Sequence, residues 1–197
     1  GDMILFFGMI VKEFAVGALL GLMGAILFSA VQLSGQIFGI QLGFGIVNVI
    51  DPMSDDQISL LGQFEFLIAI LLFMAVNGHH LLLAAIMNSY KFIPMNGFRM
   101  SASLNEQIIG LLGKMFVIAY KIGFPMIAAI FIVNAAMGVI ARTVPQMNVF
   151  IVGLPLNIYL GLSVMAVSIG FLVMVLLGYF DQFFRDVEVM FRIAGGT

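Results

Sequence analysis

The chain has 197 residues, of which 62% are hydrophobic and 9% charged, and its mean hydropathy is +1.18. About a quarter of the residues in a soluble domain are charged, so this composition excludes a soluble globular protein and indicates a membrane protein. The net charge of -2 without any basic cluster argues against nucleic acid as a partner, and the absence of cysteine excludes disulfides and thiolate metal sites.

The longest uncharged segment at the start of the chain extends from Phe14 to Ile50. One membrane span needs about 20 residues, so this segment is too long for one straight helix and too short for two helices with a loop. It must bend or break. Small residues four apart allow helix backbones to approach closely, and we expect such packing against helices or other subunits at Gly17, Gly21, Gly35 and Gly39.

The helix is expected to end near Leu42, and an irregular segment is expected from there to about residue 59. Pro52 disfavours helix at the residue before it, and an acidic patch of Asp51, Asp55 and Asp56 follows the glycine-rich part. In lipid, an unsatisfied amide costs roughly 2 to 7 kcal/mol, so non-helical backbone must be buried in protein or line a water-filled cavity. The break therefore indicates a channel or a partner surface.

Apolar side chains exclude water and glycines allow rearrangement, so this segment is suited to closing a hole, although an ordinary connecting loop explains the pattern equally well. The candidate plug comprises Gln41, Leu42, Gly43, Phe44, Gly45, Ile46, Val47, Asn48, Val49, Ile50, Asp51, Pro52 and Met53.

A helix is predicted next, from Gln57 to Asn77, with Asp55 or Asp56 as its N-cap. The pair Asn77–Gly78 then predicts either a kink in one long helix or a tight hairpin. His79 and His80 are adjacent and would point about 100° apart on a helix, so they are not expected to chelate a metal ion.

The clearest loop extends from Lys91 to Asn105, and Ser103 with Glu106 three residues later predicts a capping box at the start of the next helix. Pro125 is expected to kink that helix. The segment 142–150 predicts a second break.

An uncharged run from Ile151 to Phe180 follows this break. The tail that begins at Asp181 alternates charged and apolar residues, which is typical of an amphipathic helix at a membrane interface.

Three ionisable side chains lie inside apolar helices: Glu65, Lys114 and Lys121. Each costs about 2.5 to 3.5 kcal/mol to place within a span. We expect ion pairs between helices or between subunits rather than a proton relay, since a relay usually needs several acids. The sequence contains no motif of a metalloprotease, a serine hydrolase or a nucleotide-binding loop, so neither an enzyme nor a cofactor is expected.

Three blocks of sequence closely resemble, in order and spacing, the FliR/SctT family of type III export-gate proteins. They are GQIFGIQLGFGIVNVIDPMS from Gly35, NGHHLLLAAIMNSYKFIP from Asn77, and ARTVPQMNVFIVGLPLNIYLG from Ala141. The resemblance extends over essentially the whole chain.

The resemblance implies an all-α integral membrane protein of bent helical hairpins, assembled with FliP-type and FliQ-type subunits and FlhB in the bacterial inner membrane, at the flagellar basal body. It implies a non-enzymatic part of the export channel, through which flagellar proteins pass. The segment matching residues 41–59 would plug the closed channel. Residues 1–197 would form a single domain that lacks the family's N-terminal apolar stretch.

Two alternatives stay open. The motifs NGHHLLL and PQMNVF favour a flagellar protein over the injectisome counterpart SctT. A secondary transporter with a broken helix would need a matching break in a second half of the chain, and Gly153 to Pro155 is a poor match for Gly35 to Pro52.

Overall fold

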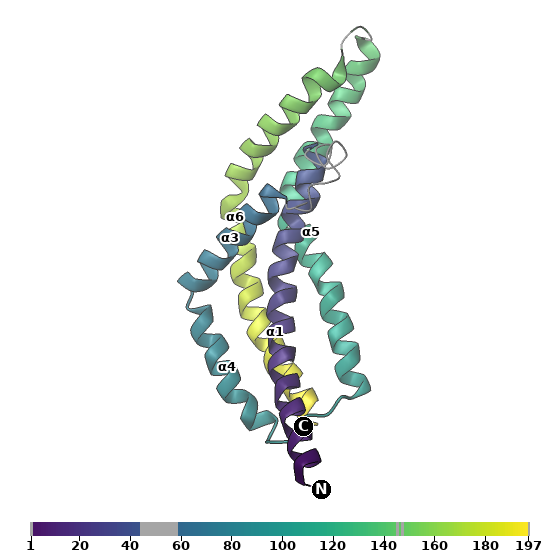
Figure 1. The fold of residues 1–197 in the computed structure, drawn as a ribbon. Helices are drawn as coiled ribbons and strands as arrows, with labels where there is room; N and C mark the ends of the chain where they lie inside the picture. The colour runs from purple at the N-terminus through teal and green to yellow at the C-terminus, as the bar shows by residue number, and fades with distance from the viewer. Residues whose placement is uncertain (1, 44–58, 145, 147, 197) are drawn as a thin grey trace. The chain divides into compact units, whose positions relative to one another are not determined.

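The computed structural model describes residues 2–43, 59–144, 146 and 148–196. Within these ranges the chain is helical and contains no strand, which confirms the expected all-α class. The helices are α1 (Asp2–Gln41), α3 (Leu60–Ala75), α4 (Gly78–Phe92), α5 (Ala102–Thr143) and α6 (Val149–Gly195), as Figure 1 shows. The plug candidates Phe44 to Met53, together with Asp55 and Asp56, lie outside the described residues.

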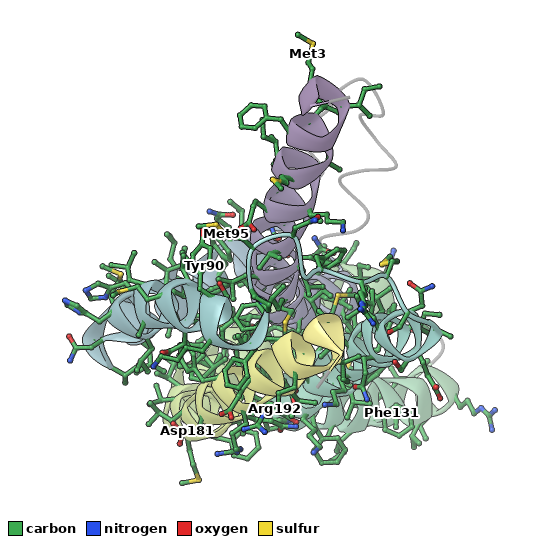
Figure 2. All side chains as sticks on the ribbon, turned by 90° about the horizontal axis from the view of Figure 1, so that it is seen from below. Met3, Tyr90, Met95, Phe131, Asp181 and Arg192 are labelled. Atoms are coloured by element: carbon green, nitrogen blue, oxygen red, sulfur yellow. The ribbon has the colours of Figure 1, made fainter. Side chains whose placement is uncertain are left out.

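In the part of the chain that the structure describes, three helices are long and apolar enough to cross a membrane, namely Phe6–Gln41, Ala102–Thr143 and Ile151–Gly195. In the last of these, only 22% of the most apolar stretch is buried within the protein. Large apolar side chains therefore project from the helices, and Phe131 is an example that is 71% exposed (Figure 2). Lipid or other protein chains must cover such a surface, because exposing large apolar side chains to water is unfavourable.

The start of α3 differs from the sequence prediction. The helix begins at Leu60, and the Ser59 hydroxyl accepts a hydrogen bond from the backbone N–H of Gly62 at 3.2 Å. Ser59 is therefore the N-cap of α3, which begins three residues after the predicted start at Gln57, and the predicted caps Asp55 and Asp56 lie outside the described residues. The physical reason is local, because a serine next to the first helical residue already supplies the acceptor oxygen.

The break between α3 and α4 is a kink and not a hairpin. The two helices are bent by 69° at this break, as in a broken membrane span or a re-entrant loop. Asn77 adopts a left-handed conformation with φ 59°, and an added Cβ at Gly78 would overlap the ring of Phe73. Asparagine tolerates this backbone region and glycine leaves room for the ring, so the pair turns the chain within two residues.

The loop before α5 is shorter than predicted, because α4 continues to Phe92 and α5 begins at Ala102. The Ser101 hydroxyl accepts a hydrogen bond from the N–H of Leu104 at 3.2 Å, which makes Ser101 the N-cap. Ser103 lies inside the helix, where its hydroxyl is 2.9 Å from that of Ser101. The predicted capping box of Ser103 and Glu106 was therefore wrong by two positions.

Both long helices are more continuous than the sequence suggested. α5 extends through Pro125 to Thr143, and α6 begins at Val149, so the second break is limited to residues 144–148. The tail after Asp181 belongs to α6. Its apolar residues are buried within the protein, so this face packs internally rather than on a membrane surface; they are Phe183, Val187, Met190, Phe191 and Ala194.

The helices divide into two compact units. Unit 1 comprises residues 1–29, 69–117 and 176–197, and unit 2 comprises residues 30–68 and 118–175. The core of unit 1 contains an aromatic cluster made by Phe28, Phe73, Phe180, Phe183 and Phe184. The core of unit 2 contains Phe38, Leu42, Leu61, Met126, Ile130 and Met165. The single domain over residues 1–197 stays a prediction.

Candidate functional site

The C-terminal end of α1 leads into the candidate plug. The N–H of Leu42 donates to the carbonyl of Phe38 at 3.0 Å, and the N–H of Gly43 donates to the carbonyl of Ile40 at 3.1 Å. Gly43 has φ 95°, a conformation that side chains rarely adopt. A left-handed glycine just after the last helical residue is a common helix stop, so Gly43 ends α1 near the predicted point.

Leu42 anchors this helix end in the core of unit 2. Its side chain is fully buried and packs in the cluster with Phe38 and Met126. Gly161 of α6 lies so close that an added Cβ would overlap the Leu42 methyl groups. Leu42 is thus a core residue, and any closing side chains must come from the residues that follow it. Gln41 precedes this anchor, and its side-chain oxygen is buried without a hydrogen-bond partner among the described residues.

A glycine crossing joins α1 and α3 in unit 2. Gly35 lies directly against Gly62, where an added Cβ would overlap the Gly62 backbone. The Ser59 hydroxyl donates to the carbonyl of Gly35 at 3.2 Å, and an added Cβ at Gly39 would be 2.9 Å from that hydroxyl oxygen. Glycines allow this approach because the helices meet backbone to backbone.

The crossing also fixes the far end of the candidate plug segment. Ser59 contacts α1 at Gly35 and Gly39, and Gly39 is only four residues, or about 6 Å of helix, from Gly43. The described residues on either side of this segment, Gly43 and Ser59, therefore lie near the same part of α1. Both ends of the segment are attached to one well-packed part of unit 2.

The other two glycines singled out from the spacing behave differently. An added Cβ at Gly17 or Gly21 would meet nothing within 4 Å. These positions leave open surface on the first half of α1, and their predicted role in subunit packing stays a prediction.

Two polar side chains are buried beside the glycine crossing. Glu65 of α3 lies one turn after Gly62 and is 0% exposed, and the polar side chain that interacts with its carboxylate is Ser34 of α1, at a separation too long for a close hydrogen bond. Ser34 precedes Gly35, is also 0% exposed, and its hydroxyl would be 3.0 Å from a Cβ added at Gly123 of α5. Burying polar groups with few hydrogen-bond partners costs free energy, so Glu65 and Ser34 are unusual residues to find at a contact between two helices.

The two lysines of α5 lie in different units. In unit 1 the Lys114 ammonium is 3.0 Å from the carboxylate of Asp186 on α6, which is an ion pair between helices. Lys121 belongs to unit 2 and is exposed.

The model of bacterial export proteins, family 1, matches residues 1–183 of this chain. The chain belongs to this export family. The flagellar biosynthetic protein FliR of Bacillus subtilis (strain 168) is 36% identical over 188 residues, covering 93% of this chain and 72% of that protein. The FliR protein of Aquifex aeolicus is 29% identical over 177 residues, covering 90% of this chain and 68% of its own length. That of Escherichia coli K12 is 28% identical over 156 residues, covering 79% and 60%.

The comparisons confirm the family resemblance drawn from three sequence blocks. The first block begins at Gly35 and contains the end of α1 with its anchor Leu42. The second covers the Asn77 kink and α4, and the third covers the turn into α6 as far as Gly161. In this export protein the first and third blocks therefore meet in unit 2, where Leu42 contacts Gly161.

Sequence reasoning missed several residues that build the export protein's site. Gly62, Gly123 and Gly161 are single glycines inside apolar helices, without the regular spacing that identified the glycines of α1. An isolated glycine in a helix costs about 1 kcal/mol relative to alanine, which is itself a signal that something packs closely there. Asp186 was treated as part of a polar tail, and only the structure pairs it with Lys114.

Proposed function

We propose that this chain is a non-enzymatic membrane subunit of the flagellar protein-export apparatus, located in the bacterial inner membrane at the flagellar basal body. The match to the export family over residues 1–183 supports this most strongly. The relatives named as flagellar biosynthetic proteins favour a flagellar role over the injectisome counterpart. The span-capable helices support a membrane location.

Within this apparatus, residues Phe44 to Met53 would close the export channel. The support is that the residues on either side of the segment are held, Leu42 in the core of unit 2 and Ser59 at the glycine crossing. An apolar segment held at both ends can close a narrow passage by excluding water. The channel itself would be built together with FliP-type and FliQ-type subunits and FlhB, and flagellar proteins would be its transit substrates.

The closing role is tested by replacing residues 44–53 with a glycine–serine segment of equal length in the full chain, expressed in its own bacterium. Because both anchors are kept, the export complex is expected to assemble as before. The inner membrane is expected to leak small ions when export is idle, which is measured from the membrane potential with a fluorescent dye.

The matched control is the double change Met95→Gly and Met100→Gly, which removes apolar side chains that are 82% and 67% exposed in another loop. Cells that contain this control variant should show no leak of small ions across the inner membrane. Unchanged ion permeability in cells that contain the assembled glycine–serine variant would exclude the closing role. The broader proposal is tested separately, since deletion of the whole chain should abolish flagella and motility.

A further inference from the structure

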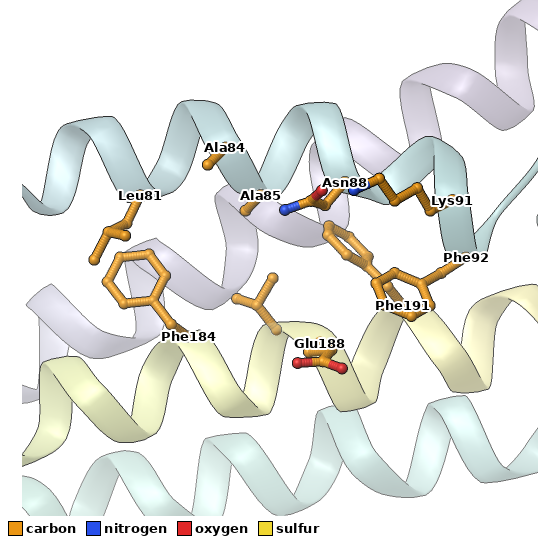
Figure 3. A pocket seen from close by; sticks show the side chains of 10 residues that line it. Leu81, Ala84, Ala85, Asn88, Lys91, Phe92, Phe184, Glu188 and Phe191 are labelled. Atoms are coloured by element: carbon orange, nitrogen blue, oxygen red, sulfur yellow. The ribbon is translucent and has the colours of Figure 1, made fainter.

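A groove lies between α4 and the C-terminal part of α6, entirely within unit 1 (Figure 3). Its volume is about 390 Å³. The groove exists because Ala84 and Ala85 of α4 have short side chains, while the floor on α6 is formed by Val187 and Phe191, which are each 2% exposed. No mechanism described above uses this space.

The polar side chains of the groove lie toward one end. Leu81 and Phe184 face each other at the first end, and Figure 3 shows Lys91 at the second end with Phe92 and Phe191 beside it, and Asn88 and Glu188 on the way to it. The groove is therefore apolar along its whole length and carries polar and charged groups only toward the Lys91 end. An elongated molecule with one apolar and one polar end fits this gradient.

The polar end has a positive charge available for a ligand. Glu188 is paired with Arg192 at 2.6 Å, and the Arg192 guanidinium also lies over the Phe92 ring at 5.1 Å. Lys91 has no carboxylate within ion-pair distance in the described part of the chain. An unpaired lysine at this end favours an anionic group there.

The length of the groove matches one leaflet of a bilayer. Ten residues separate Leu81 from Lys91, which corresponds to about 15 Å of helix. Half of a hydrocarbon core of about 30 Å is also about 15 Å. An acyl chain lying between Leu81 and Asn88 would thus bring its headgroup to the level of Lys91.

The groove is too narrow to enclose a helix of another subunit. Such a helix is about 10 Å wide and could insert only the side chains of one face. An extended acyl chain is far thinner. The single unpaired lysine at one end also has no role in holding an apolar helix.

We propose that the α4–α6 groove binds an anionic phospholipid, with an acyl chain over Ala84 and Ala85 and the phosphate on the Lys91 ammonium. The apolar end between Leu81 and Phe184 would receive the terminal part of the chain. The bound lipid would be a structural ligand of unit 1. The proposal is independent of the closing role assigned to residues 44–53.

The test is native mass spectrometry of the full chain, extracted in detergent with the subunits it assembles with, and titrated with palmitoyl-oleoyl phosphatidylglycerol or phosphatidylcholine. The wild-type chain is expected to retain phosphatidylglycerol preferentially. Lys91→Glu is expected to reduce that retention about tenfold, because it reverses the charge that faces the phosphate. Lys91→Arg should keep it, and Ala84→Leu should reduce retention of both lipids by filling the groove.

Matched controls are Arg142→Glu, an exposed charge reversal in unit 2, and Ala136→Leu, an enlargement on an exposed face of α5. Both should bind lipid like the wild type, and circular dichroism would verify that all variants are folded. Equal retention of the two lipids, or wild-type retention by Lys91→Glu, would overturn the proposal. A photocrosslinking benzoylphenylalanine at Leu81 gives an independent readout, since crosslinks to another protein chain instead of lipid would also overturn it.

Discussion

The two halves of α1 carry the same sequence signal and use it differently. Gly17 and Gly21 in the first half are four residues apart and face open space, whereas Gly35 and Gly39 in the second half have the same spacing and are tightly packed. Glycines four residues apart leave a strip of the helix without side chains in both halves. Only in unit 2 does another backbone, that of α3 at Gly62, lie against this strip.

The units to which these halves belong are also built differently. Unit 2 combines an apolar core with the glycine crossing of α1 and α3 at Gly35 and Gly62. Unit 1 contains a cluster of large rings, with Phe73 contacting Phe28 at 5.5 Å and Phe180 at 5.3 Å between centroids, and a backbone contact of its own at Gly195. Rings can shift and repack, but two backbones in contact cannot accommodate a new side chain. Substitutions at the glycine crossing and in the ring cluster should therefore differ in cost.

The largest effect is expected from Gly35→Leu. The new side chain would overlap the Gly62 backbone, so the free energy of unfolding should fall by about 3 kcal/mol or more. Gly21→Leu, in the other half of the same helix, should change it by less than about 1 kcal/mol. Thermal unfolding of the chain in detergent, followed by circular dichroism, makes the comparison. Equal losses for the two variants would mean that the contrast between the halves of α1 is wrong.

The next largest effect is expected from Phe73→Ala in the aromatic cluster. Phe73 is 6% exposed and contacts three other rings, so its removal should cost about 3 kcal/mol of unfolding free energy. Phe131→Ala is the matched control, because this phenylalanine is 71% exposed, and its loss should cost less than about 1 kcal/mol. A cost for Phe73→Ala no greater than that of the control would show that the rings do not stabilise unit 1.

A smaller effect of opposite sign is expected from Glu65→Gln. Its carboxylate is buried with only the Ser34 hydroxyl near it, and an amide costs less to bury than a charged group. The unfolding free energy of the isolated chain should stay the same or rise by about 1 kcal/mol. A clear fall would reveal a partner for the carboxylate within the chain. Loss of the variant from the assembled export complex, with normal stability alone, would place that partner on another subunit.

The smallest effect is expected from breaking the ion pair in unit 1. The Lys114 and Asp186 side chains are 48% and 27% exposed, so solvent screens their attraction, and Lys114→Ala should cost about 0.5 kcal/mol or less. The double exchange Lys114→Asp with Asp186→Lys should recover most of that loss at low salt. The measurement is thermal unfolding of the chain in detergent. A loss of unfolding free energy above about 2 kcal/mol would mean that the pair is shielded from solvent.

Composition alone was enough to indicate a membrane protein, because so few charges are typical of chains accommodated in lipid, and the family resemblance added the all-α class. The end of α1 near Leu42 followed from the glycines after it, since glycine is the residue that leaves a helix at positive φ. The three blocks around Gly35, Asn77 and Ala141 identified the export family. These are local or compositional properties, and a sequence contains them directly.

The caps and the contacts of unit 2 were decided only in the tertiary structure. Ser59 and Ser101 act as caps because of where α3 and α5 begin, and nearby acids and serines offered equally good candidates in the sequence. Leu42 belonged to an apolar run whose members look alike, and only the approach of Gly161 made it an anchor. Such contacts join residues far apart in the chain. The residue spacing within one helix does not show which other helix packs against it.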